Sequence, residues 1–373
     1  MDIGYVSNVV YPFVTGGAEK RIYEIGHRLA GDGHDVTIYG RQFWDGSAVR
    51  DHDGMTLRAV APERDIYSGD RRSIAEAVDF AARAAPSLAR RAGGHDVLVA
   101  SVFPYFPVFS CTLAAAGRTP LVTTWHEVWT DYWDEYLGRL ALGGKVVERV
   151  AANVPQHPVA VSETTARKLA TVGPDRESIT VVPNGIDVGH VQSLVPADKR
   201  FDLLFVGRLI DDKNVDVLLR AVARLDGDLR VGVVGDGPER DALERLAVDL
   251  GVDDRVTFPG FLEEHDDVLA TMRAADVFVS PSVREGFGIT LVEAMAAGCR
   301  VVAVDHPNAA SREVVGDAGY LAQPTVECLA ATIDSALVDT ADTDAVLARA
   351  RQFDWDEIAA QELDAYRSAL RRR

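Results

Sequence analysis

The feature of this sequence that most constrains its fold is a rhythm of short apolar runs, rich in β-branched residues, that alternate with helical patterns. The rhythm runs through the first half of the chain and restarts near residue 200. Such alternation is typical of βαβ units, in which helices join the strands of a parallel sheet. The strands predicted are Asp2–Val6, Asp35–Tyr39, Thr56–Val60, Asp96–Ala100, Pro120–Thr124, Pro158–Val161 and Ser178–Val182, then Asp202–Val206, Leu229–Val234, Arg255–Phe258, Asp276–Ser280 and Arg300–Val304.

The repetition predicts two domains, and the length agrees, because single cores stop growing beyond about 300 residues whereas this chain has 373. We therefore expect an α/β protein of two Rossmann-like, doubly wound domains facing across a cleft, since open parallel sheets bind ligands at the carboxyl ends of their strands. The first domain is expected at residues 1–187 and the second at 201–354, with 188–200 as a polar linker. Dehydrogenases, epimerases, binding proteins and transferases all use this layout.

The composition limits which binding partners and which cellular compartment are expected. The formal net charge of −18 argues against binding to nucleic acid or to an anionic membrane through the whole surface, because both need a basic face, and it leaves only local basic patches open. Lys supplies only 5 of the 39 basic residues. This acid-rich, Lys-poor composition resembles that of proteins from high-salt cytoplasms and predicts a halophile-like acidic surface. The three cysteines have no metal-ligand spacing and are interpreted as buried free thiols. Without a leader or an apolar run of about 18 residues, the chain is expected to be cytoplasmic.

Two motifs of the first half follow predicted strands, at the carboxyl ends where a parallel sheet binds ligands. Gly16-Gly17 opens a helix after the first strand, so its amides could face an anion, although paired glycines also serve tight turns. Their spacing departs from Gly-x-Gly-x-x-Gly, which argues against a nicotinamide cofactor. His126 follows the apolar run 121–124 and is interpreted either as a site residue at a strand's end or as an ordinary surface or core histidine.

Cations follow the first strand of the second half. Arg208 stands at its end and Lys213 five positions later. A planar guanidinium and a compact ammonium at this place suit a diphosphate. Lys213 is the more informative of the two, because this sequence uses Lys so rarely.

The segment Ser280–Gly298 carries the most information. Gly286 and Gly288 expose backbone amides at the start of an apolar helix, which is a site suited to an anion. Glu285 lies on the loop before these amides, and Glu293 lies about one turn inside the helix. Carboxylates so placed can accept hydrogen bonds from hydroxyls at both ends of a nucleotide sugar. The alternative is a pair of solvated acids.

Taken in order, these motifs resemble the retaining glycosyltransferases of family 4, also called group 1, which have the two-domain GT-B fold. The resemblance covers nearly the whole chain and follows Gly16-Gly17, His126, Pro183-Asn184-Gly185, Gly207-Arg208 with Lys213, Gly235-Asp236-Gly237-Pro238, and Glu285 through Glu293 to Gly298. The sequence departs from the family after Val304, where Asp305-His306-Pro307-Asn308 replaces the usual Gly-Gly pair. We assign no donor contact to that segment.

The resemblance implies a reaction and a role for each motif residue. It implies metal-independent transfer of a hexose-type sugar from a UDP- or GDP-sugar, without a cofactor and with retention, to a glycan, lipid-linked or small-molecule acceptor. It also implies that the C-terminal helix, 355–373, completes the first domain. The catalytic residues implied are His126, Arg208, Lys213 and Glu285, and the donor-binding residues implied are Gly16, Gly17, Arg208, Lys213, Gly286, Phe287, Gly288, Ile289 and Glu293.

Two alternatives share this fold: a sugar-nucleotide 2-epimerase and a non-catalytic nucleotide-sugar-binding protein. No motif indicates the acceptor. The stretch Arg139–Arg149 mixes apolar and basic residues. It fits either an amphipathic core helix or peripheral contact with the inner face of a membrane.

Overall fold

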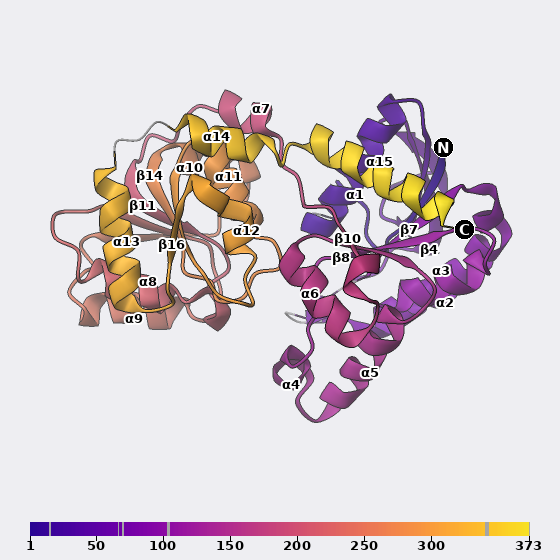
Figure 1. Cartoon of the computed structure of the whole chain (residues 1–373), viewed down its shortest axis with the longest axis horizontal. Helices are drawn as coiled ribbons and strands as arrows, with labels where there is room; N and C mark the ends of the chain where they lie inside the picture. The colour runs from indigo at the N-terminus through magenta and orange to yellow at the C-terminus, as the bar shows by residue number, and fades with distance from the viewer. Residues whose placement is uncertain (15, 66, 69–70, 103–104, 340–342, 373) are drawn as a thin grey trace. The chain divides into compact units, whose positions relative to one another are not determined.

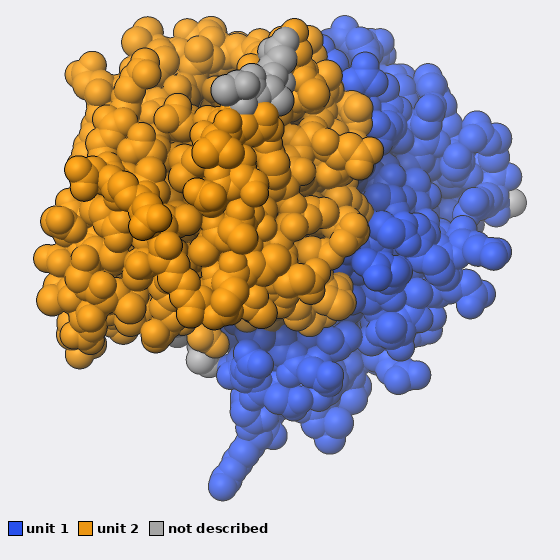
Figure 2. Space-filling view, turned by 60° about the vertical axis from the view of Figure 1, so that its left-hand side comes forward, with its two compact units in different colours: residues 1–184, 355–373 blue, residues 185–354 orange. Residues whose placement is uncertain are grey.

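The computed structural model describes residues 1–372 except 15, 66, 69–70, 103–104 and 340–342, so Arg373 of the expected C-terminal helix lies outside the described residues. The chain folds as two compact units, shown in different colours in Figure 2. Unit 1 comprises Met1–Asn184 and Trp355–Arg373, and unit 2 comprises Gly185–Asp354. Each unit is built on one large sheet, parallel in unit 2 and parallel except for one strand in unit 1, with helices packed against it (Figure 1).

Unit 1 contains an eight-stranded sheet in the order β10-β9-β8-β7-β1-β2-β4-β3, in which only β3 is antiparallel to its neighbour. Its strands are β1 (Asp2–Val6), β2 (Asp35–Gln42), β3 (Val49–His52), β4 (Met55–Pro62), β7 (Val97–Ser101), β8 (Leu121–Trp125), β9 (His157–Ala160) and β10 (Thr180–Val181), with a separate pair β5 (Tyr67–Ser68) and β6 (Arg71–Arg72). Its helices are α1 (Gly17–Gly31), α2 (Ile74–Arg91), α3 (Phe106–Ala115), α4 (Tyr132–Leu137), α5 (Ala141–Ala152), α6 (Glu163–Val172) and α15 (Trp355–Arg371).

Unit 2 contains six parallel strands in the order β13-β12-β11-β14-β15-β16, which is the 3-2-1-4-5-6 order of the Rossmann fold. Its strands are β11 (Phe201–Val206), β12 (Val231–Val234), β13 (Val256–Gly260), β14 (Ala275–Ser280), β15 (Arg300–Val304) and β16 (Tyr320–Ala322). Its helices are α7 (Val188–Ser193), α8 (Val215–Val222), α9 (Arg240–Asp249), α10 (His265–Arg273), α11 (Ile289–Ala297), α12 (Ser311–Val315), α13 (Val326–Val338) and α14 (Asp344–Arg351).

The last helix, α15, is part of unit 1. Its side chains Trp355, Ile358 and Tyr366 are buried in the same apolar cluster as Ile25 and Leu29 of α1. The chain therefore enters unit 2 after residue 184 and leaves it after residue 354.

Residues 188–200, expected as a linker, lie within unit 2 instead. They begin with helix α7, because the Asp187 side chain accepts a hydrogen bond from the His190 amide at 2.7 Å and so caps the helix. Val188 and Val191 of this short helix are buried. The stretch was predicted as a polar linker, and its composition indicated neither the helix cap nor the burial of the two valines.

Candidate functional site

The strand order of unit 2 reverses between β11 and β14, and open α/β sheets bind ligands at such a switch point. Two loops leave this point, 207–214 after β11 and 281–288 after β14. The loops are joined, because the Val283 amide donates to the Asp212 carbonyl at 3.2 Å and Arg284 lies 3.5 Å from the Asp212 carboxylate. They form one continuous surface beyond the ends of the strands.

Lys213 and Glu285 meet on this surface. The Lys213 ammonium donates to the Glu285 carboxylate at 2.5 Å, although 72 residues separate them in sequence. Each side chain is 21% exposed, so the pair is sheltered but reachable by a ligand. Lys213 ends a short 3-10 helix, and Asn214, with φ +48°, then turns the chain into α8. Two residues of the predicted site are therefore in direct contact.

The backbone of Glu285 is held by the segment after β15. The Glu285 amide donates to the Asn308 carbonyl at 3.2 Å, and the Ala310 amide donates to the Glu285 carbonyl at 3.0 Å. Arg312 pairs with Asp305, and that guanidinium lowers the pKa of the Asp305 carboxyl. The departure from the family pattern at 305–308 thus lies beside the predicted site, a proximity that no motif or spacing indicates.

The start of α11 is open to a ligand. Gly288 has φ +86° as the residue before the helix, and no described side chain caps this end; the Leu291 amide donates to the Gly288 carbonyl at 3.0 Å, which leaves the amides of the first two helix residues for an acceptor. Phe287 is only 5% exposed and packs against Phe353 with ring centroids 5.6 Å apart. Gly286 and Ile289 flank this turn.

Glu293 points from α11 toward α10. It is 6% exposed, and its Oε1 accepts a hydrogen bond from Nε2 of His265 at 2.9 Å. His265, the first residue of α10, was not among the predicted site residues. No periodicity or motif links two residues 28 positions apart on different helices.

Arg208 is exposed, and no other described side chain is bonded to it. Its loop is fixed through the backbone, because the Leu209 amide donates to the Asp236 carbonyl at 2.9 Å. Gly235 must be glycine, since a Cβ there would lie 1.9 Å from the Gly207 carbonyl oxygen. A Cβ on Gly237 would lie 2.3 Å from the Leu209 carbonyl oxygen. These two glycines allow the two loops to pack together.

In unit 1, His126 follows β8 and is partly buried. Desolvation by burial, with a smaller contribution from the nearby Arg21 charge, lowers the pKa of His126 to about 3. Its imidazole is therefore neutral at ordinary pH. It lines a small cavity with Ser101, Thr124 and Tyr5.

Arg21 links α1 to the Pro183-Asn184 turn and to α15. It donates to the Pro183 carbonyl, to Oδ1 of Asn184 at 3.1 Å and to Glu362 at 2.6 Å. Arg21 and Glu362 are almost completely buried. The Pro183-Asn184-Gly185 motif is thus an anchoring point for a buried arginine.

Glu148 of α5 fixes the loop that follows His126. Its buried carboxylate accepts from the Trp129 amide at 2.7 Å, the Thr130 amide at 2.9 Å and the Tyr105 hydroxyl at 2.8 Å. Glu148 is 1% exposed. The sequence analysis missed it, since one acid within a helical pattern carries no distinguishing signal.

Gly16 is the residue before α1, and Gly17 is the first of the helix. A Cβ on Gly16 would lie 2.4 Å from a carboxylate oxygen of Glu19, which is buried in the first turn. An anion at this helix end would meet the Glu19 charge. The start of α11, which has no acid in its first turn, is the more favourable place for a phosphate.

Two Rossmann-like domains in one chain define the GT-B class of fold. The chain belongs to the group 1 glycosyltransferases of family 4: residues 15–190 match the model "Glycosyltransferase Family 4", and residues 190–353 match "Glycosyl transferases group 1". It is a glycosyltransferase.

Similar proteins cover the whole chain. Glycogen synthase of Mycobacterium tuberculosis is 27% identical over 392 residues, which cover 96% of this chain and 93% of that protein. Sucrose-phosphate synthase of Thermosynechococcus elongatus has a TM-score of 0.77 at 20% identity, with both chains covered completely. HepE of Anabaena, solved in complex with UDP-glucose, has a TM-score of 0.72 at 22% identity over 99% of this chain and all of that one. The two structures share the fold.

Among the described residues, no group of three or more His, Cys, Asp or Glu side chains is arranged to hold a metal ion. No helix in the described part of the chain combines the length and apolarity needed to cross a bilayer.

Proposed function

We propose that this glycosyltransferase moves a hexose from a UDP- or GDP-sugar to a glycan, lipid-linked or small-molecule acceptor, with retention of configuration and without a metal. The observation that carries the proposal is the Lys213–Glu285 contact at the switch point of unit 2, on the loop before the uncapped start of α11. A cation, a carboxylate and free amides in one place match a ligand with phosphates and hydroxyls.

The donor diphosphate is assigned to Arg208, Lys213 and the amides at the start of α11. Breaking the sugar–phosphate bond leaves negative charge on the departing diphosphate. Preorganised cations and amides stabilise that charge in the transition state and replace a metal ion in this role. Gly16 and Gly17 would approach the donor through their backbone, since neither carries a side chain.

Glu293 and Glu285 are proposed to bind different parts of the donor. Glu293 would accept hydrogen bonds from the ribose, and Glu285 from hydroxyls of the transferred sugar. Because Glu285 is paired with Lys213, it is poorly suited to act as a general base. The departing phosphate would instead accept the acceptor's proton on the face from which it leaves, and the configuration is retained.

His126 would contact the sugar as a neutral imidazole. The transition state of glycosyl transfer resembles an oxocarbenium ion, which is positively charged. A protonated histidine would repel that charge, whereas the low pKa of His126 keeps the ring neutral. A neutral imidazole can still donate one hydrogen bond to a hydroxyl.

A thermal-shift screen of UDP- and GDP-sugars tests the proposal. Donor at about 100 times its Kd stabilises the folded state by about 2.7 kcal/mol, so one nucleotide series should raise Tm by several degrees. The UDP complexes of HepE favour the UDP series. An unchanged Tm with every donor would contradict the proposal. In deuterated water, a 2-epimerase would incorporate deuterium into UDP-N-acetylglucosamine without an acceptor, whereas a transferase would not.

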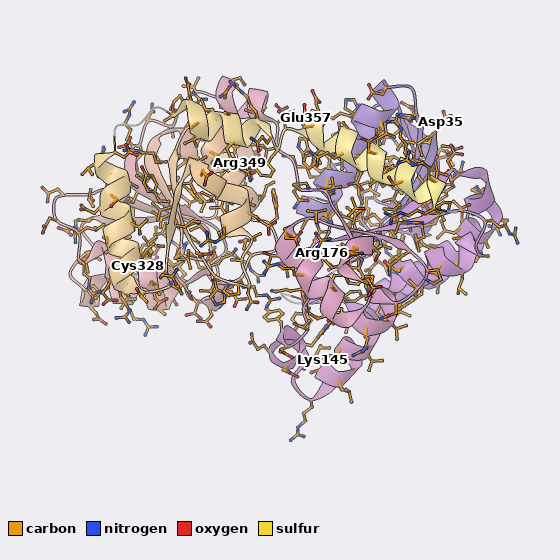
Figure 3. The ribbon with its side chains drawn as sticks, in the orientation of Figure 1. Asp35, Lys145, Arg176, Cys328, Arg349 and Glu357 are labelled. Atoms are coloured by element: carbon orange, nitrogen blue, oxygen red, sulfur yellow. The ribbon has the colours of Figure 1, made fainter. Side chains whose placement is uncertain are left out.

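We also propose that α5 touches a membrane surface, since its apolar residues face outward. Leu142, Val146 and Val150 recur every fourth residue and are 73%, 52% and 51% exposed, and Leu140 before the helix is 72% exposed. Such a stripe suits the boundary of headgroups and acyl chains. Lys145, labelled in Figure 3, is engaged with Asp134 at 2.7 Å, so Arg139 and Arg149 would supply the attraction to anionic lipid.

Flotation with phosphatidylglycerol vesicles tests this surface. The triple variant Leu142→Ser, Val146→Ser, Val150→Ser should lose vesicle binding and keep its fold. Val248→Ser, which alters a 60% exposed valine of unit 2, is the control and should float like the unchanged chain. Absence of the unchanged chain from the vesicle fraction would remove the membrane proposal and leave the transfer proposal intact.

A further inference from the structure

His265 and Glu293 form a pair that extends from the interior of unit 2 to its surface. The two residues come from α10 and α11, which lie side by side in unit 2 (Figure 1). The Glu293 side chain is 7% exposed, whereas that of His265 is 48% exposed. The pair thus joins a buried carboxylate to a ring that a ligand can reach.

The hydrogen-bonding chemistry of the pair is determined by the carboxylate. An ionised carboxylate only accepts, so the His265 Nε2 donates in this hydrogen bond. Among the described residues, no other side chain donates to Glu293 and none bonds Nδ1 of His265. Glu293 Oε2 is therefore an acceptor left for a hydroxyl donor.

A purely structural role does not account for this pair. Burying a carboxylate with a single partner is costly, and apolar residues usually stabilise such a position as well or better. The half-exposed ring also limits what the pair adds to stability. A binding role explains why the carboxylate is both buried and incompletely bonded.

We propose that His265 is a positioning residue for the nucleoside of the donor. By holding Oε1 of Glu293, it turns Oε2 toward the ribose hydroxyls, and so selects a ribonucleoside diphosphate over its deoxy form. This inference rests on the proposed donor site at Glu293. Because the ribose does not change during transfer, the contact adds equally to the ground state and the transition state. Loss of His265 should raise the donor KM and leave kcat nearly unchanged.

Calorimetric titration with UDP and GDP tests the inference, with the tighter nucleotide used throughout. His265→Ala should weaken binding about tenfold, the usual effect of removing a hydrogen bond to a charged group. His265→Gln, whose amide can donate to Glu293, should recover most of the affinity. The control is His190→Ala, because His190 is 44% exposed and its Nε2 lies 2.7 Å from Asp266, the residue next to His265. This control should bind like the unchanged chain.

The 2′-deoxy and 3′-deoxy nucleotides separate a ribose contact from general damage. The unchanged chain should bind at least one of them about tenfold more weakly, and His265→Ala should add less than about twofold to that loss. An equal loss for the ribo and deoxy forms, or a fall in kcat at constant KM, would overturn the role of His265. If the unchanged chain binds neither UDP nor GDP, the donor proposal falls together with this one.

Discussion

Six parallel strands of each unit follow the same order, to which unit 1 adds β3 and β10, but the two units differ in how the charged side chains discussed above are bonded. In unit 1, Arg21 and Arg41 are 2% and 0% exposed, and each has several fixed partners. In unit 2, Arg208 is exposed, and among the described side chains Lys213 and Glu285 bond only to each other, each 21% exposed. The same fold therefore carries charges that fix loops in one unit and charges that remain accessible in the other.

Arg41 shows how complete the bonding in unit 1 is. Its guanidinium contacts Glu76 at 2.5 Å, Asp79 at 2.9 Å and the Pro62 carbonyl at 2.9 Å. Asn8 donates to the second oxygen of Glu76 at 3.0 Å. Such a network cannot exchange a partner without leaving a buried charge unpaired. A partly exposed pair exchanges its partner for a ligand at small cost.

The largest expected effect is on catalysis in unit 2. Lys213→Ala and Glu285→Ala should each lower kcat/KM by about 10³-fold, because each removes a group proposed to act on the transferred sugar or its leaving group. Unfolding in urea should change by less than about 1 kcal/mol, since the pair is partly exposed. Both are measured with the donor found by thermal shift.

Arg230→Ala is the matched control for this prediction. Arg230 pairs with Asp202 at 3.0 Å in the same unit, and its side chain is 59% exposed. Its loss should leave kcat/KM within about twofold. Full activity of Lys213→Ala and Glu285→Ala would show that the accessible pair is no more functional than this surface pair.

The next effect is on the stability of unit 1. Arg21→Met leaves Glu362, whose side chain is 1% exposed, without its charged partner. Breaking a buried pair in this way should lower the free energy of unfolding by about 3 kcal/mol. Urea denaturation followed by circular dichroism measures the loss.

Arg28→Met is the comparison for Arg21. Arg28 also lies on α1 and also contacts α15, through Asp356 at 2.6 Å, but its side chain is 22% exposed and that of Asp356 is 81% exposed. Its loss should lower the free energy of unfolding by less than about 1 kcal/mol. Equal losses for Arg21→Met and Arg28→Met would mean that burial is not what distinguishes the charges of unit 1.

The fold was largely predictable, because alternating apolar runs specify strands locally. The described strands that the sequence analysis missed are the polar, exposed β3, the two-residue β5 and β6, and the three-residue β16, none of which has enough apolar residues for a pattern. In the site, the positions of Lys213 and Glu285 at strand ends were predictable. Their mutual contact was not, because it depends on which strands are neighbours in the sheet.

Hydrogen bonds between side chains and elements far apart in the sequence were the least predictable part of the molecule. His265 and Glu148 each bond to a residue or loop on another element, at 2.9 Å to Glu293 and at 2.7 Å to the Trp129 amide. Neither belongs to a motif. Such contacts arise from the packing of helices and loops, which periodicity does not encode.

The smallest expected effect concerns His126 of unit 1 and acid. The pKa of its imidazole is about 3 in the folded protein and 6.5 ordinarily. Below pH 6.5 this imidazole is protonated in the unfolded chain but stays neutral in the folded chain. His126 therefore lowers the free energy of unfolding progressively as the pH falls toward 3. His126→Gln should therefore lose about 2 kcal/mol less stability than the unchanged chain between pH 7 and pH 5. Urea unfolding at both pH values measures this, and parallel pH dependence in the two proteins would show that His126 is not held neutral by burial in unit 1.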